Sequence, residues 1–385
     1  MYARDRSTPL SHWWWTVDRL LLAALTALIL GGIILSLAAS PPVATRIGLD
    51  PFHFFNRHVM FILPAFLVMI GISFLSPRQV RRSALIMFAI SVMLLAATLA
   101  FGAEVKGSRR WISILGISIQ ASEFAKPAFV VLVAWLFSES ARQPEMPATS
   151  LALAALLLVV ALLVLEPDFG QTMLILMVWG ALFFMAGMRM IWVAGLAGAA
   201  LAGLFGAYMF VPHVARRIKR FMDPASGDTF QVDMATESFA RGSWFGQGPG
   251  EGIVKRIIPD SHTDFIFSVA AEEFGILFCM LLVMIFAFIV LRGLSHAFKE
   301  KDDFVRFAVA GLVLQIGMQS MINIGVNLEL MPAKGMTLPL ISYGGSSMMA
   351  ICVTAGFLLA LTRHRPEKRA QERSFFRVNA GLPAE

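Results

Sequence analysis

Residues 149–165 read TSLALAALLLVVALLVL, a run without a single charged side chain. About 20 predominantly apolar residues are needed to cross the hydrocarbon core of a bilayer as a helix, so this run predicts a transmembrane segment. It lacks the alternation of apolar and polar residues that marks a strand of a membrane β-barrel. A helix is therefore expected, because it satisfies its own backbone groups where lipid offers no partners.

Similar apolar runs occur along the chain both before and after this one. Of the 385 residues, 57% are hydrophobic and 15% are charged, whereas a soluble domain usually carries about 25% charged residues. The fourth of these runs, at 124–138, is short, so we expect it to be tilted, broken or shielded by its neighbours. We predict an all-α polytopic membrane protein with about ten transmembrane helices, at residues 17–38, 58–77, 83–102, 124–138, 149–165, 170–187, 190–211, 263–291, 304–328 and 341–362.

Basic residues indicate which side of the membrane the loops face. Many lie in the two tails, at 78–82 and at 292–306, and short basic loops are usually cytoplasmic. We therefore predict a cytoplasmic tail at 1–16, a membrane domain at 17–362 and a basic cytoplasmic tail at 363–385. Much of the formal net charge of +7 lies in that last tail, beside a membrane helix, so it does not indicate nucleic-acid binding.

The segment 212–262 is then one long outer, periplasmic loop between the seventh and eighth helices. Its Pro and Gly residues make an independent domain improbable, and we expect it to fold over the outer membrane face. Residues 213–220 are expected to form a short basic interfacial helix. This loop and the segment 103–126 hold most of the outer basic residues, against the positive-inside rule, which suggests a use for cations outside. Cys279 and Cys352 lie within apolar runs, so no disulfide or metal framework is predicted.

A first group of polar residues on the outer side combines Arg109, Arg110 and Trp111 with Glu123 and Lys126. The planar guanidinium group matches the oxygens of a phosphate, so this group is suited to gripping phosphate or pyrophosphate. Anchoring at the lipid headgroups is an alternative interpretation that fits the spacing equally well.

A second group precedes and enters the eighth predicted helix, with His262 and Asp264 followed by Glu272 and Glu273. Asp264 is placed either to cap the helix or to do chemistry. The two glutamates lie about 12 Å into the helix, at a rise of about 1.5 Å per residue. Ionisable side chains at such depth usually face a cavity or a partner.

A third group comprises Lys334, Ser342 and Tyr343, just before or at the start of the last predicted helix. Amide side chains on the ninth helix share one face, because they recur every four residues, and that face must contact protein or water: Gln315, Gln319, Asn323 and Asn327. Together the three groups suit an anionic lipid substrate handled at the outer leaflet. Their spacing alone does not separate transfer chemistry from transport.

Four motifs resemble those of the SEDS family, the bacterial shape, elongation, division and sporulation proteins: GSRRW at 107–111, EPDFG at 166–170, PDSHTDFIF at 259–267 and PAKGMTLPLISYGGSS at 332–347. The resemblance covers about residues 17–362. In the last motif, Lys334 and the Thr that follows it are more similar to the division proteins of the family than to its elongation proteins.

The resemblance implies a peptidoglycan glycosyltransferase that polymerises lipid II into glycan strands at the outer face of the inner membrane, at the division septum. The essential acid of the family matches Asp264, which we expect to act as the general base for the attacking hydroxyl. We predict substrate-binding roles for the surrounding polar and aromatic residues: Arg109, Arg110, Trp111, Glu123, Lys126, His262, Lys334, Ser342 and Tyr343.

No sequence feature requires a cofactor, although a divalent cation, Mg²⁺ or Mn²⁺, could share the stabilisation of the pyrophosphate leaving group. The resemblance further implies a class B penicillin-binding (FtsI-like) transpeptidase and other divisome proteins as partners. Three alternatives stay open at this point: a lipid II flippase, a polymerase of the elongation type, and a non-catalytic scaffold of the division machinery.

Overall fold

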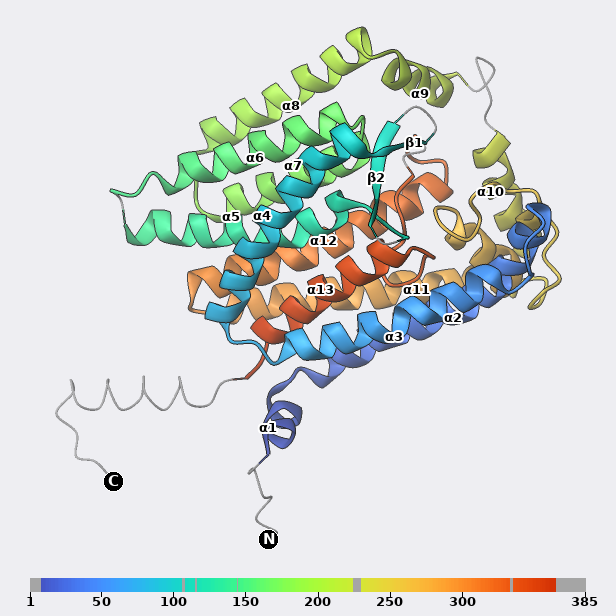
Figure 1. The fold of residues 1–385 in the computed structure, drawn as a ribbon, viewed down its shortest axis with the longest axis horizontal. Coiled ribbons are helices and arrows are strands. Elements are labelled where there is room, and N and C mark those ends of the chain that lie inside the picture. The colour runs from blue at the N-terminus through green and yellow to red at the C-terminus, as the bar shows by residue number, and fades with distance from the viewer. Residues whose placement is uncertain are drawn as a thin grey trace.

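The fold is seen in a computed structural model that describes residues 8–105, 108–114, 116–143, 145–223, 230–332 and 335–364. Long helices lie side by side and form one bundle (Figure 1). Each predicted range overlaps one apolar helix, which confirms the all-α membrane fold. These helices are α2 (Arg19–Arg46), α3 (His53–Ser73), α4 (Pro77–Phe101), α5 (Ala121–Arg142), α6 (Ala148–Leu165), α7 (Phe169–Met185), α8 (Met190–Phe210), α11 (Ile266–Lys299), α12 (Asp303–Asn327) and α13 (Gly345–Leu361).

The helices expose apolar side chains on the surface of the bundle. Among the described residues, eight helices are long and apolar enough to cross a bilayer, and α7 and α13 are shorter apolar helices. Leu67 on α3 and Ile86 on α4 remain exposed. Exposed side chains of this kind are stable when lipid rather than water surrounds the helix.

The interior of the bundle is formed by α5, α12 and α13, whose residues are mostly buried. Of the most apolar stretch of each helix, 89% is buried in α5 and 72% in α12. The fourth segment is thus shielded by its neighbours, and its helix extends beyond the predicted run 124–138 at both ends. A Cβ atom on Gly311 of α12 would lie 2.6 Å from Cγ1 of Val130 on α5. Glycine therefore allows this close approach, as small residues do between membrane helices.

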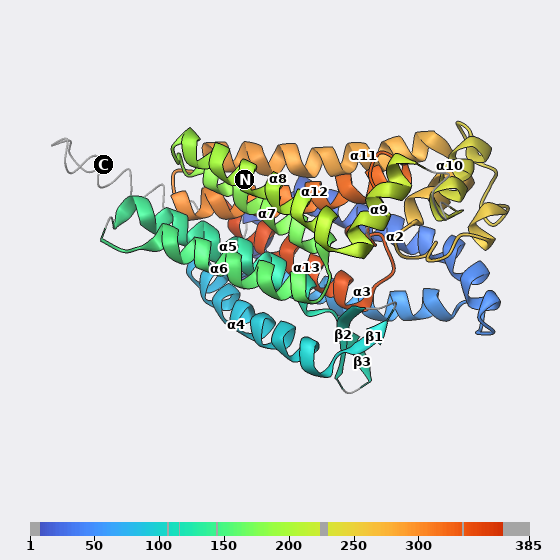
Figure 2. The same ribbon diagram turned by 90° about the horizontal axis from the view of Figure 1, so that it is seen from above.

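A small antiparallel sheet, which the sequence did not lead us to expect, connects α4 to α5. Its strands β1 (Ala103–Val105), β2 (Ser108–Ile114) and β3 (Ile117–Ile119) lie in the order β1-β2-β3, with Ala103 opposite Trp111 and Ile112 opposite Ile119. The sheet projects from one end of the bundle (Figure 2). Strands this short carry too little periodicity to be distinguished from a polar loop.

The long segment 212–262 contains helices of its own. These are α9 (Pro212–Met222), α10 (Phe230–Gly242) and the short 3₁₀ helix η2 (Val254–Arg256). The basic interfacial helix expected at 213–220 thus corresponds to α9. Helix α10 packs against α11 at the end of the bundle opposite the C-terminal end of α11 (Figure 2).

Helix α11 is broken at Gly275, which has a φ of +81°. Glycine adopts this conformation readily because it has no Cβ atom. The loop 243–248 bonds to the backbone groups that the break frees. Ile276 donates to the carbonyl of Ser243 at 2.9 Å, and Gln247 donates to that of Glu272 at 2.9 Å. The residues that follow Asp264 therefore form a short helix of their own, held by the loop 243–248.

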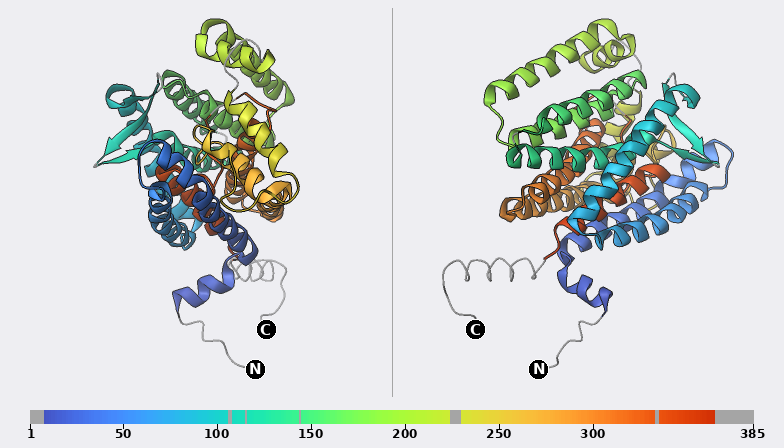
Figure 3. Two further views of the ribbon diagram at one scale, coloured as in Figure 1. Left: turned by 90° about the vertical axis from the view of Figure 1, so that its right-hand side faces the viewer. Right: turned by 60° about the vertical axis from the view of Figure 1, so that its left-hand side comes forward.

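The opposite end of the bundle gathers the two ends of the described chain. Helix α1 (Pro9–Thr16) lies there beside the end of α13 (Figures 1 and 3), and the N–H of His364 donates to the carbonyl of Thr16 at 2.9 Å. The predicted tail at 1–16 therefore includes a helix. Residues 1–7 and 365–385 of the two predicted tails lie outside the described residues.

Candidate active site

The polar face of α12 anchors the loop that carries Asp264. Nδ2 of Asn323 donates to the carbonyl of Asp264 at 2.9 Å and to that of Met336 at 2.6 Å. Nδ2 of Asn327 donates to the same Asp264 carbonyl at 3.0 Å. Both amides are buried, so the predicted stripe does contact protein. Its function here is to hold the loops 260–265 and 335–338 against each other.

The carboxyl group of Asp264 faces the second of these loops. Its Oδ2 lies 3.3 Å from the place that a Cβ atom would take on Gly335, and the side chain is half-buried. The N-cap position of α11 belongs to Phe265, so Asp264 is not the N-cap residue. Lys334, for which we predicted a substrate-binding role, lies outside the described residues.

His262, Ser342 and Tyr343 join the same two loops. Oγ of Ser342 donates to the carbonyl of Thr263 at 2.6 Å, and the N–H of Tyr343 donates to the carbonyl of His262 at 3.0 Å. The rings of His262 and Tyr343 contact each other and Phe54 of α3. Burial lowers the pKa of His262 to about 4, so its imidazole is neutral at pH 7.

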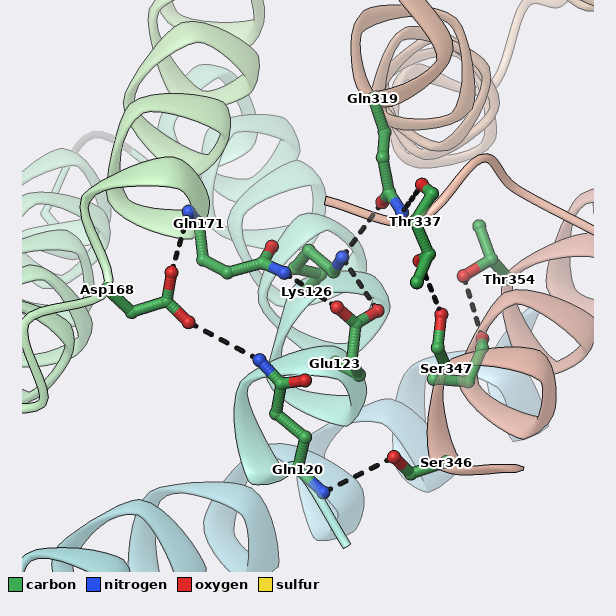
Figure 4. A network of polar contacts seen from close by, with 11 residues as sticks. Gln120, Glu123, Lys126, Asp168, Gln171, Gln319, Thr337, Ser346, Ser347 and Thr354 are labelled. Atoms are coloured by element: carbon green, nitrogen blue, oxygen red, sulfur yellow. Dashed lines mark hydrogen bonds and ion pairs between the residues drawn. The ribbon is translucent and has the colours of Figure 1, made fainter. Parts of the chain in front are cut away.

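A buried polar network lies where α5 and α7 begin (Figure 4). Nζ of Lys126 pairs with Glu123 at 2.8 Å and donates to Oε1 of Gln319 at 2.8 Å. Glu123 also accepts from Nε2 of Gln171 at 2.6 Å, and Gln319 donates to the carbonyl of Thr337 at 3.1 Å. The network thus links α5, α7 and α12 to the loop that faces Asp264. The predicted substrate contacts of Glu123 and Lys126 stay a prediction.

The turn between α6 and α7 holds two further carboxyl groups. Asp168 accepts from Nε2 of Gln120 at 3.3 Å and from the N–H of Gln171 at 3.3 Å. Burial raises the pKa of Glu166 to about 8, with the nearby charge of Asp168 as the second cause, and burial also raises the pKa of Asp168. The guanidinium of Arg110 bonds to the carbonyls of Glu166 and Pro167 and offsets part of this effect.

The raised pKa of Glu166 leads to a prediction for stability. The folded chain keeps this proton up to about pH 8, whereas an unperturbed glutamate loses it near 4.5. Between these values the folded state binds more protons than the unfolded state, so stability falls as pH rises. We expect wild type to lose apparent melting temperature relative to Glu166→Gln between pH 5 and pH 9, as measured by thermal unfolding in detergent. Parallel pH curves for the two proteins would contradict this, and the exposed Glu145→Gln is the matched control.

The two arginines and the tryptophan of the first predicted group lie on β2. Neighbouring residues of a strand point to opposite faces of a sheet, so Arg109 and Arg110 diverge. Arg109 is exposed and lies 3.6 Å from Glu104, whereas Arg110 contacts the carbonyls of the α6–α7 turn. Trp111 is half-buried. The two guanidinium groups are therefore placed for different contacts.

Glu272 and Glu273 have protein partners, as their depth in the helix predicts. The carboxylate of Glu272 accepts from the N–H groups of Ile253, Val254 and Lys255 at 2.6 to 2.9 Å. Glu273 pairs with the buried Nζ of Lys255. These acids attach the long segment 212–262 to α11, a function that their local sequence did not identify.

A resident metal site is not evident from the donor groups. Within the described ranges, His, Cys, Asp and Glu side chains form no group of three that could hold a metal ion. The divalent cation expected from the sequence therefore stays a prediction, and no step below is assigned to one.

Comparison with known proteins places the chain in a family. The model of the FtsW, RodA and SpoVE cell cycle proteins matches residues 18–367. The chain belongs to this SEDS family. A relative from Caulobacter vibrioides, a probable peptidoglycan glycosyltransferase FtsW, is 47% identical over 366 residues, which cover 95% of this chain and 94% of the relative. A relative of the same description from Legionella pneumophila is 32% identical over 374 residues, covering 94% of both.

Solved structures of the family share the fold. A chain from a structure that concerns the coordination of polymerization and crosslinking by a peptidoglycan synthase complex has a TM-score of 0.75 and 27% identity, and the match covers 90% of this chain and 97% of that one. The rod shape determining protein RodA of Thermus thermophilus has a TM-score of 0.66 and 26% identity, with 91% and 97% covered.

Proposed function

We propose that this SEDS protein is a peptidoglycan glycosyltransferase of the division type that polymerises lipid II at the outer face of the inner membrane. The observation that carries the proposal is the position of Asp264, whose carbonyl is held by Asn323 and Asn327 and whose carboxyl faces the loop at Gly335. The FtsW description of its relatives supports the same activity and the division branch.

In the proposed reaction, a sugar hydroxyl of one lipid-linked glycan attacks the anomeric carbon of another. A new glycosidic C–O bond forms, the bond to the lipid pyrophosphate breaks, and Asp264 accepts the hydroxyl proton. A general base must lie within hydrogen-bond reach of that proton, and a carboxyl group that is only half-buried permits this. Cationic side chains would stabilise the departing pyrophosphate; we assign this to the exposed Arg109 and, from its motif, to Lys334.

We further propose a class B penicillin-binding transpeptidase and other divisome proteins as partners at the septum. A transpeptidase would cross-link the strands that this chain makes. The similarity to a chain of a peptidoglycan synthase complex supports such an assembly.

The function is tested with the purified full chain and fluorescent lipid II, with and without the transpeptidase, scored as polymer on a gel. We expect polymer in at least one of the two conditions. Movement of lipid II between leaflets of a vesicle without polymer would instead favour the flippase. Neither movement nor polymer in either condition would favour a scaffold.

Arg109 and Arg110 are expected to respond differently to substitution by Lys, which keeps the charge but loses the planar fork. Arg109→Lys should lower turnover about tenfold or more without changing stability, because a hydrogen bond to a charged group contributes about 1.5–3 kcal/mol. Arg110→Lys should lower the melting temperature too, since its contacts hold the α6–α7 turn. Wild-type turnover in Arg109→Lys would identify that side chain as an interfacial anchor only.

The orientation is tested by cysteine labelling in a background that lacks Cys279 and Cys352. Glu251→Cys in the long loop and Arg78→Cys in the first turn of α4 are both exposed positions. If the long loop is periplasmic, an impermeant maleimide labels Glu251→Cys in intact spheroplasts and Arg78→Cys only after lysis. The reverse pattern would overturn the proposed topology.

A further inference from the structure

A cavity of about 530 Å³ lies between the C-terminal ends of α11 and α13 and the first turns of α12. These helix ends lie on the side of the two described chain ends, at the opposite end of α11 from α10 (Figure 1). Its volume falls in the range of about 300–1,000 Å³ that is usual for ligand pockets. Neither the proposed reaction nor the outer loops use this cavity.

The walls of the cavity combine two kinds of side chain. An apolar wall is formed by residues of all three helices: Phe288, Leu291, Val305, Val309 and Leu361. A basic group is formed by residues of the last turns of α11 and the residues after α13: Arg292, His296, Lys299, Arg363 and His364.

The basic group is partly fixed by neighbouring residues. Asp18 binds Nε of Arg292 at 2.7 Å and Nε2 of His296 at 2.5 Å. The carboxylate thus uses the Nε atom of the guanidinium and not its two terminal nitrogens. Nε of Arg363 donates to Oγ1 of Thr16 at 3.0 Å. These contacts reduce the rotamer freedom that a ligand would otherwise have to restrict.

The two remaining charged residues of the lining, Glu300 and Lys299, differ in how far other contacts already use their charge. The side chain of Glu300, the acid among the lining residues, accepts from the N–H groups of Lys301 and Asp302 at 2.9 and 3.1 Å, so its charge is partly used by the α11–α12 turn. Lys299 is exposed in the last turn of α11. The cavity therefore offers donors from Arg292 and Lys299 next to an apolar wall.

Building on the proposed topology, which puts this end of the bundle on the cytoplasmic side, we propose that this cavity binds the headgroup of an anionic phospholipid of the cytoplasmic leaflet. Its phosphate would lie among Arg292, Lys299 and His364, and the first methylene groups of its acyl chain would contact Leu291 and Phe288. Basic pockets between membrane helices on the cytoplasmic side favour such headgroups. An inorganic phosphate would use the cations alone and would leave the apolar wall without a partner.

The test uses the full chain in an uncharged detergent, titrated with fluorescent phosphatidylglycerol or phosphatidylcholine. We expect tighter binding of phosphatidylglycerol. Lys299→Gln should weaken it about fivefold, because a basic residue near anionic lipid contributes about 1 kcal/mol. Ser295→Trp, at an exposed position of the lining, should weaken it at least as much by filling the mouth without a change of charge. Lys301→Gln, which removes the same charge outside the lining, should stay within twofold of wild type.

Three results would overturn the proposal: equal affinity for the two lipids, wild-type affinity in Lys299→Gln and Ser295→Trp, or displacement of phosphatidylglycerol by millimolar inorganic phosphate, which would assign the site to free phosphate. Unchanged melting temperatures of the variants show that they fold. The readout is lipid binding, so it does not depend on the proposed polymerisation.

Discussion

Asp264→Asn is expected to lower glycan polymerisation by about 10²–10⁴-fold, the usual contribution of general acid–base catalysis. The substitution keeps the size of the side chain but removes the group that accepts the proton. The contacts of Asn323 and Asn327 are made to the backbone carbonyl of Asp264, so they survive the change. The fold and the binding of a transpeptidase should therefore be preserved.

The measurement is polymer yield from lipid II, together with the melting temperature of the same preparation. Asp260→Asn is the matched control, because it makes the same change four residues earlier in the same loop. The φ of Asp260 is +58°, a conformation that asparagine also tolerates, so turnover should stay within about threefold of wild type. A stable Asp264→Asn protein with comparable turnover would exclude the general-base role, since loss of a true base costs far more.

The membrane helices could be predicted from the sequence because each is a continuous apolar run. A run such as 149–165 predicts a helix without reference to the rest of the chain, since lipid leaves the backbone no alternative to internal hydrogen bonds. The sheet at 103–119 was missed because its strands are only three to seven residues long, although isoleucines alternate with serines in the second and third of them. The break at Gly275 was missed because one glycine inside a long apolar helix gives no local sign that a distant loop, 243–248, satisfies its backbone.

The residues of the candidate site were found one by one, but their partners were not. The four-residue spacing of Gln319 and Asn323 placed them on one face of a helix, yet it did not identify Lys126 or Met336 as the groups they contact. Arg109 and Arg110 were grouped because they are adjacent, and in a strand adjacency separates two side chains. Pairings of this kind depend on packing between segments far apart in the chain.

The Lys126–Glu123 pair provides the largest expected effect on stability. Both side chains are almost fully buried, with exposures of 2% and 4%. Removal of one partner leaves the other charge unpaired in a low-dielectric interior, which usually costs about 3–5 kcal/mol. Lys126→Met should therefore lower the apparent melting temperature in detergent strongly. Arg241→Met breaks an exposed i,i+4 pair with Glu237 and should change stability by about 1 kcal/mol or less.

The double variant Glu123→Gln, Lys126→Met should recover most of the lost stability, because no unpaired charge remains and replacing both members of a buried ion pair is often close to neutral. Gln at position 123 still accepts the hydrogen bond that Nε2 of Gln171 now donates to Glu123. A double variant as unstable as Lys126→Met alone would show that the loss comes from packing or from the contact with Gln319, and not from the buried charge. Once stability is restored, polymer yield of the double variant separates the two roles of Lys126: yield that returns with stability assigns the pair to support of the bundle, and yield that stays low assigns Lys126 to the substrate.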